Sequence, residues 1–145
     1  MKNFFNLKHF LTFWALFIFA FSLIACENTA NESGEETTVS PVVITIDSDF
    51  AVTDDTTLID YMNYLKSQNE LNFTITNGMV DSFNGVKNTG DFSKCWMLYT
   101  DDADYSNQAW GSINIDGVTY NSAVLGANDL PITQGKTYIW VYQSF

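Results

Sequence analysis

The chain divides into an apolar amino-terminal run, a polar stretch and a longer segment in which short apolar runs alternate with turn residues. The apolar run covers residues 10–24, and the polar stretch 27–40 holds one valine and no aromatic residue. From residue 41 onward, runs rich in β-branched and aromatic side chains are separated by Asn-Gly, Asp-Gly and Gln-Gly pairs. Such pairs favour tight turns between strands. The pattern predicts one folded domain, residues 41–145, built mainly of strands.

Strand-like alternation is clearest over residues 71–76. There Leu71, Phe73 and Ile75 alternate with polar residues, as in a strand with one exposed face. Asn77-Gly78, Asn84-Gly85 and Asp116-Gly117 are expected to be turns. The other expected strands are 42–46, 79–83, 95–99, 112–115, 118–120 and 138–142.

Residues 57–68 have the spacing of a helix, because Leu58, Met62 and Leu65 recur at i, i+4 and i+7. A threonine and an aspartate three residues apart at the start of this segment have the spacing of a capping box. One helix among six or seven short strands predicts the α+β class, with the helix packed on a mainly antiparallel sheet.

The amino-terminal run is typical of an export signal. Lys2 and Lys8 precede its apolar part, which is shorter than the ~20 residues needed to span a bilayer. The run ends in Leu-Ile-Ala-Cys at residues 23–26, which resembles the lipobox of bacterial lipoproteins. This resemblance implies a signal peptide over residues 1–25 and a lipid on Cys26. The alternative that the pattern leaves open is an uncleaved membrane anchor.

Residues 26–40 follow as the acylated cysteine and an acidic spacer. Four glutamates and a single valine cannot bury enough apolar area to offset chain entropy, so a flexible tether is expected. The resulting prediction is a domain held at a bacterial cell membrane and facing outside the cytoplasm. The second cysteine, Cys95, has apolar neighbours, which favour a small buried hydrophobe over a reactive thiol.

The balance of charges narrows the classes of function. Six basic residues against 17 acidic ones give a net charge of −11. Without residues 1–25 the chain has four lysines and 17 acids, hence −13, and neither histidine nor arginine. Such a surface repels nucleic-acid phosphates, and a Ser-His-Asp arrangement or a histidine metal site cannot be built from it. We therefore expect no enzyme activity, no cofactor and no nucleic-acid partner.

An acidic cluster in the expected loop 101–110 has part of the spacing of a calcium site. Asp102, Asp104 and Ser106 match positions one, three and five of an EF-hand loop, but a glycine at position six and a glutamate at position twelve are missing. A solvated loop is favoured, and no metal site is expected.

Several segments together resemble a bacterial domain family of unassigned function. They are residues 57–62, 79–86, 96–99, 126–127 and 134–140. That family is similar to the carboxyl-terminal β-domain of the vitamin B12 carriers transcobalamin and intrinsic factor. Over most of residues 42–143, the resemblance implies a β-grasp-like, ubiquitin-like domain of a surface lipoprotein.

The last expected strand offers a candidate binding surface. Tyr138, Trp140 and Tyr142 share one face of it, while Ile139 and Val141 share the other. If the aliphatic face packs on the helix, the three rings form an exposed stripe that could stack on a sugar, a corrin or an apolar patch of another protein. The pattern equally allows the aromatic face to be the core face, or to be covered by the 101–110 loop.

Trp110 and Tyr105 are further candidates, because aromatic residues in loops are frequent at binding sites. The alternative is that Trp110 caps the core. Together these features predict a lipid-anchored binding module outside the cytoplasm, for a small molecule such as a corrinoid or for a glycan. The other hypothesis is a structural or interaction lipoprotein that docks a transporter component or another envelope protein.

Overall fold

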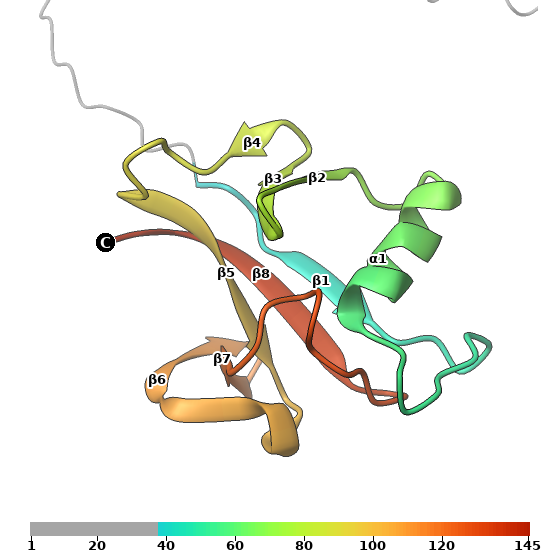
Figure 1. The fold of residues 1–145 in the computed structure, drawn as a ribbon. Coiled ribbons are helices and arrows are strands. Elements are labelled where there is room, and N and C mark those ends of the chain that lie inside the picture. The colour runs from blue at the N-terminus through green and yellow to red at the C-terminus, as the bar shows by residue number, and fades with distance from the viewer. Residues whose placement is uncertain (1–37) are drawn as a thin grey trace, which may run out of the picture. The chain divides into compact units, whose positions relative to one another are not determined.

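The computed structural model of the protein describes residues 38–145. The expected signal peptide 1–25, Cys26 and most of the expected tether lie outside the described residues. The described part is an α+β domain, as predicted (Figure 1). Its elements are β1 (Val42–Thr45), α1 (Leu58–Ser67), β2 (Phe73–Thr76), β3 (Met79–Phe83), β4 (Val86–Lys87), β5 (Lys94–Thr100), a 3-10 turn (Ala103–Tyr105), β6 (Ser106–Ile115), β7 (Val118–Ala123) and β8 (Thr137–Ser144).

The strands form two antiparallel sheets instead of one. Five of them pair in the order β1-β8-β5-β7-β6, and the other three in the order β2-β3-β4. In Figure 1, α1 and the three-stranded sheet lie on one side of the β1-β8-β5 part of the larger sheet. The β6–β7 hairpin lies at the bottom of the view, away from α1 and the three-stranded sheet. The β-grasp character that the resemblance implies stays a prediction.

The three predicted hairpin turns are present. Each has two consecutive residues with positive φ, as a type I′ turn requires, and the twist of that turn matches the twist of the strands on either side. They are Asn77-Gly78 (52° and 80°), Asn84-Gly85 (48° and 85°) and Asp116-Gly117 (52° and 83°).

The helix also begins and ends as local chemistry dictates. The backbone N–H of Thr57 donates to the carboxylate of Asp60 at 2.9 Å, completing the predicted capping box. This bond holds the pKa of Asp60 below its usual range. At the other end Asn69 has a φ of 62°, and the N–H of Glu70 donates to the oxygen of Leu65 at 2.9 Å, as in a Schellman motif.

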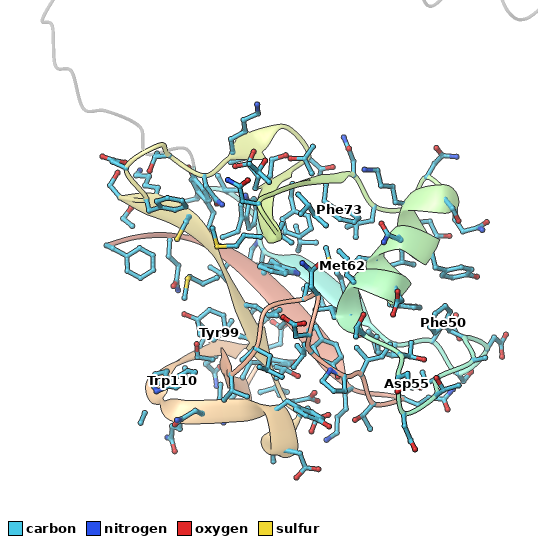
Figure 2. All side chains as sticks on the ribbon, in the orientation of Figure 1. Phe50, Asp55, Met62, Phe73, Tyr99 and Trp110 are labelled. Carbon is cyan, nitrogen blue, oxygen red and sulfur yellow. The ribbon has the colours of Figure 1, made fainter. Side chains whose placement is uncertain are left out.

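The core lies between the helix, the small sheet and one face of the large sheet. Figure 2 shows Met62 of α1 and Phe73 of β2 pointing into this space; both are buried. Val39, in the segment expected to be tether, is partly buried against the core. The packed domain therefore begins slightly before residue 41.

The aromatic face of β8 is the core face, so the expected exposed stripe is wrong for Tyr138 and Trp140. Their side chains are 0% and 5% exposed. Ile139, on the opposite face, is buried as well, and its cross-strand neighbours are Val43 on β1 and Tyr99 on β5. Tyr142, near the strand end, is half-buried, and its hydroxyl donates to the backbone oxygen of Lys87 at 2.8 Å.

The expected loop 101–110 is largely structured. A 3-10 turn is followed by β6, which begins at Ser106 instead of the expected residue 112. The register of β6 against β7 shifts between Asn107 and Ser112, so the intervening residues form a bulge. Trp110 lies on this bulge with 62% of its surface exposed, and it does not cap the core (Figure 2).

Candidate binding pocket

A gap opens in the large sheet where β7 leaves β5. The two strands pair through Tyr99 and Thr100. Beyond that point the chain leaves β5 and stays beside the start of β6. The N–H of Val124, just after β7, donates to the oxygen of Tyr105, just before β6, at 3.0 Å. β5 continues alongside β8 back to Lys94. In this pairing scheme, residues 95–98 have a strand neighbour on the β8 side alone.

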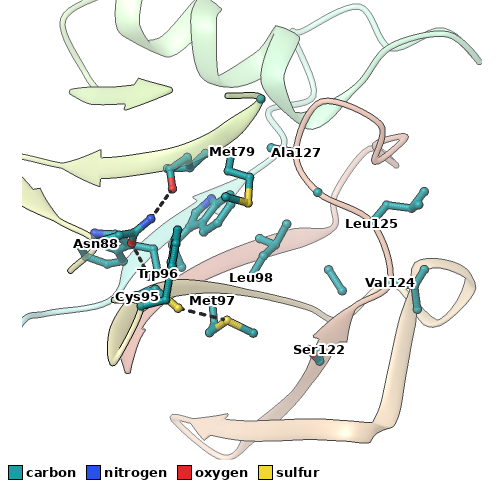
Figure 3. Close-up of a pocket in the computed structure, with 16 residues that line it drawn as sticks. Met79, Asn88, Cys95, Trp96, Met97, Leu98, Ser122, Val124, Leu125 and Ala127 are labelled. Atoms are coloured by element: carbon teal, nitrogen blue, oxygen red, sulfur yellow. Dashed lines mark hydrogen bonds between the residues drawn. The ribbon is translucent and has the colours of Figure 1, made fainter. Parts of the chain in front are cut away.

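A pocket of about 350 Å³ occupies this gap (Figure 3). Its walls come from the start of β3, from β5 and from residues 122–127, and Trp140 of β8 also lines it. The volume falls at the lower end of the roughly 300–1,000 Å³ of small-molecule sites.

The chemistry of the pocket is apolar and rich in sulfur. Figure 3 shows the sulfur atoms of Met79, Cys95 and Met97 among the lining groups. The Cys95 and Met97 sulfur atoms lie 3.9 Å apart. Among the residues that line the pocket, none carries a charge. Methionine side chains adapt to irregular apolar partners, so these walls can accommodate ligands of different shapes.

Two asparagine side chains tie the walls of the pocket together. The side-chain amide of Asn88 donates to the backbone oxygen of Val80 at 2.9 Å and accepts from the backbone N–H of Trp96 at 2.9 Å. It therefore joins β3 to β5 (Figure 3). Asn128 donates to the oxygen of Gly78 at 2.7 Å, which links the β2–β3 turn to the chain that follows β7. The spacing of the walls is therefore set by specific hydrogen bonds.

Phe92 lines the pocket in a strained conformation. Its φ is 58°, a left-handed value that is costly for a bulky residue, and 52% of its surface is exposed. Asp91 shapes the loop by accepting hydrogen bonds from the Ser93 N–H at 3.1 Å and hydroxyl at 2.9 Å. The Ser93 N–H, then the Thr89 and Ser93 hydroxyls, lower the pKa of Asp91 to about 2. Strained residues of this kind cluster at binding and catalytic sites.

Two tryptophans line the pocket, and their indole N–H groups differ. That of Trp96 donates to the backbone oxygen of Val86 at 2.9 Å. That of Trp140 is buried and has no hydrogen-bond partner within residues 38–145. The same is true of two acceptor oxygens outside the lining, one each on Asp102 and Asn121.

The thiol of Cys95 is free and half-buried. Burial raises its pKa, so the thiol stays protonated at neutral pH and is a poor nucleophile. This agrees with its interpretation as a small hydrophobe. Within the described chain, no three His, Cys, Asp or Glu side chains are grouped so as to hold a metal ion.

Of the predicted site residues, the pocket includes Trp140. Tyr138 is fully buried in the core, Tyr142 and Tyr105 are partly buried beside it, and Trp110 lies on the β6 bulge away from the lining. Sequence reasoning did not single out Met79, Met97 or Phe92. The available signal was the alternation in residues 95–99, which sets Cys95 and Met97 on one face of the strand.

Comparison with protein-family models, with curated proteins and with solved structures found no match to the chain. The resemblance to the B12-carrier domain therefore stays a prediction. In the part of the chain that the structure describes, no helix has the length and apolar character needed to cross a membrane.

Proposed function

We propose that the domain is a binding module for a small, uncharged and mainly apolar ligand. The observation that carries this proposal is the pocket of about 350 Å³ beside β5, with its sulfur-rich, uncharged lining. Clefts of this size with apolar walls and a few polar groups are the usual form of small-molecule sites. The strained Phe92 at the pocket adds support, because such strain persists where function requires the conformation.

The pocket chemistry favours an apolar ligand over a glycan. A glycan presents many hydroxyl groups and needs several free polar partners. The amide of Asn88, a polar group in the lining, is already bonded to backbone at both its oxygen and its nitrogen. A corrinoid is larger than the pocket, so at most one of its peripheral groups would enter.

We place this module at the outer face of a bacterial cell membrane, tethered through a lipid on Cys26. The support is the export-like run and its Leu-Ile-Ala-Cys ending at residues 23–26. Replacement of Cys26 by serine should prevent acylation and release the protein from the membrane fraction. Mass spectrometry of the amino-terminal peptide and cell fractionation measure both effects. A Cys26→Ser chain that stays membrane-bound would contradict the anchor.

Methionine-methyl NMR of the full chain in lipid nanodiscs tests ligand binding. The probes are a panel of neutral aromatic and aliphatic fragments, with cobinamide and soluble oligosaccharides beside them. We expect an apolar fragment to shift the methyl signals of Met79 and Met97. Met62 is buried in the core away from the pocket and serves as the internal reference. Empty nanodiscs control for partition of the fragments into lipid.

A second candidate function is a protein-interaction lipoprotein. Trp110 favours it, because a large aromatic side chain exposed on a bulge is typical of a contact residue. If every probe leaves the Met79 and Met97 signals unchanged while Trp110→Ala abolishes capture of one fixed envelope protein, the small-molecule proposal is wrong and the interaction function replaces it.

A further inference from the structure

We infer that one end of the large sheet rests on a lipid bilayer, which Phe92 and Phe145 contact. This inference rests on the proposed membrane anchor and specifies how the anchored domain is oriented. The two phenylalanine side chains are 52% and 74% exposed. Their backbones are joined, because the N–H of Phe145 donates to the oxygen of Ser93, next to Phe92, at 2.9 Å. Phe92 also lines the pocket, so this orientation sets one wall residue at the bilayer surface.

The chain that leads to the expected anchor joins the domain at this same end. Val42 of β1 and Leu98 of β5 both pair with Trp140 of β8, so β1 and β5 run in the same direction on either side of β8. Residues 38–41, which precede β1, therefore lie toward the same end as the start of β5. Figure 1 shows the start of the described chain, the start of β5 and the carboxyl end in the same part of the view.

The length of the expected tether keeps this end close to the lipid anchor. Cys26 lies 12 residues before Thr38. Such a segment spans at most about 40 Å when fully extended. Docking of a tethered domain is an intramolecular event, so a weak contact with the bilayer is enough. The bilayer is also the one partner that the proposed anchor always holds within reach, which favours it over another protein.

The opposite end of the sheet is acidic. It gathers the loop after β1 and the segment after β5, since the N–H groups of Ile46 and Asp101 donate to backbone oxygens at or just before the start of β8, at 3.1 and 3.4 Å. Seven aspartates lie within residues 47–55 and 101–104. Bilayers with anionic lipids repel such an end, so the electrostatic interaction turns it away from the membrane.

The end that carries Phe92 has a different balance of charges. Residues 82–100 hold two lysines, Lys87 and Lys94, and one acid, Asp91, so these side chains sum to +1. Residues 94–101 extend over about 23 Å, at ~3.3 Å per residue. Screening reduces interactions beyond about 10 Å at 0.1 M salt. A bilayer at this end therefore interacts mainly with the nearby lysines, and the distant aspartates do not prevent the contact.

Paramagnetic lipids test this orientation on the full chain in nanodiscs. A gadolinium chelate on some of the lipid headgroups broadens the NMR signals of nearby amides, with an inverse sixth-power dependence on distance. β7 continues past Thr100 to the turn at residues 116–117, so this turn marks the opposite end. The relaxation enhancement at residues 90–93 should exceed that at 116–117 by at least about 10-fold, because residues 94–101 alone separate the ends by about 23 Å.

Matched variants separate the role of the rings from that of charge. Replacement of both Phe92 and Phe145 by serine should make the enhancement at the two ends nearly equal. Val118→Ser changes an exposed apolar side chain beside the 116–117 turn and should leave the difference intact. Lys87→Glu should reduce the difference in discs that contain phosphatidylglycerol, and less so in discs of phosphatidylcholine alone. If the double variant does not fold, the natural chain and Lys87→Glu decide.

The outcomes separate this inference from the proposed anchor. If the chain stays with the discs but both ends are broadened equally, or the 116–117 turn is broadened more, the orientation is overturned and the anchor stands. If the chain separates from the discs in size-exclusion chromatography, the anchor fails and the inference fails with it. Broadening concentrated at residues 90–93 and abolished in the double variant supports both.

Discussion

Trp96 donates its indole N–H to the backbone oxygen of Val86 at 2.9 Å, and this bond joins the two sheets of the domain. Trp96 belongs to β5 of the large sheet and Val86 to β4 of the small one. The ring of Trp96 also packs edge-on against Phe83 at 5.0 Å between centroids. A side chain that sets one wall of the pocket therefore also helps to hold the two layers together.

Trp96→Phe should lower the free energy of unfolding by about 1–3 kcal/mol. The variant keeps an aromatic ring but leaves the Val86 oxygen without its indole donor. Urea denaturation followed by circular dichroism measures the change. Trp110→Phe is the matched control, because Trp110 is exposed on the bulge and its replacement should stay within about 0.5 kcal/mol. Equal losses in the two variants would contradict the structural role of the Trp96 bond.

Phe92→Gly should stabilise the protein slightly and weaken fragment binding. Glycine adopts the left-handed conformation without strain, so the free energy of unfolding should rise by up to about 1 kcal/mol after its larger entropy in the unfolded chain is included. The affinity for neutral fragments should fall, because a lining ring is lost. Phe92→Ala separates the two effects. It loses the ring and keeps the strain, so binding should fall without any gain in stability.

Ionisation of Tyr138 should lower the free energy of unfolding at high pH. Burial, opposed by a hydrogen bond from the N–H of Thr133, raises the pKa of Tyr138 to about 12. In the unfolded chain the group titrates near pH 10. The contribution of the protonated Tyr138 side chain to the free energy of unfolding is therefore fully present below pH 10. As the pH rises from 10 through 12, the free energy of unfolding falls by up to about 2–3 kcal/mol. Denaturation at pH 9, 10.5 and 12 measures this loss.

Tyr138→Phe is the control for that prediction. Without the hydroxyl, the decline between pH 10 and 12 should become shallower, while the Thr133 N–H loses its acceptor and stability near neutral pH falls. An identical decline in the variant and the natural protein would assign the pH dependence to other groups.

Asp102→Asn should raise the free energy of unfolding by about 1 kcal/mol. The carboxylate of Asp102 is 3% exposed; one oxygen accepts from the Asp104 N–H at 3.2 Å, and the other has no partner in the described chain. Asparagine keeps the accepting oxygen and removes a buried charge that has no counter-ion among residues 38–145. The exposed Asp104→Asn should change stability by less than about 0.5 kcal/mol. Destabilisation of Asp102→Asn above 1 kcal/mol would reveal a partner for the second oxygen.

The features predictable from sequence were those that depend on neighbouring residues. Asn77-Gly78 and Asp116-Gly117 marked turns because positive φ at two consecutive positions suits few other pairs. The capping box needed only Thr57 and Asp60, which are three residues apart. These elements could be located without knowing how the chain folds back on itself.

The features that sequence reasoning missed depend on distant pairing. A stripe of three aromatic residues identifies one face of β8 but does not say which face meets the helix. The early start of β6 at Ser106 follows from its pairing with Ala123, and a bulge then hides the alternation. The pocket exists because β7 pairs with β5 through Tyr99 and Thr100 and then departs, which no local pattern records. Trp140 thus lines the pocket, although it was predicted as part of an exposed stripe that does not exist.

The double hydrogen bond of Asn88 has a consequence for strand pairing. The edge of β5 at residues 95–98 is the kind of unpaired backbone on which a strand of another molecule can assemble. The side-chain oxygen of Asn88 accepts a hydrogen bond from the backbone N–H of Trp96 on this edge. The side-chain nitrogen of Asn88 donates to the backbone oxygen of Val80. One polar side chain thereby takes up a backbone donor with which an added strand would have to pair, while leaving beside it a space that a small molecule can enter.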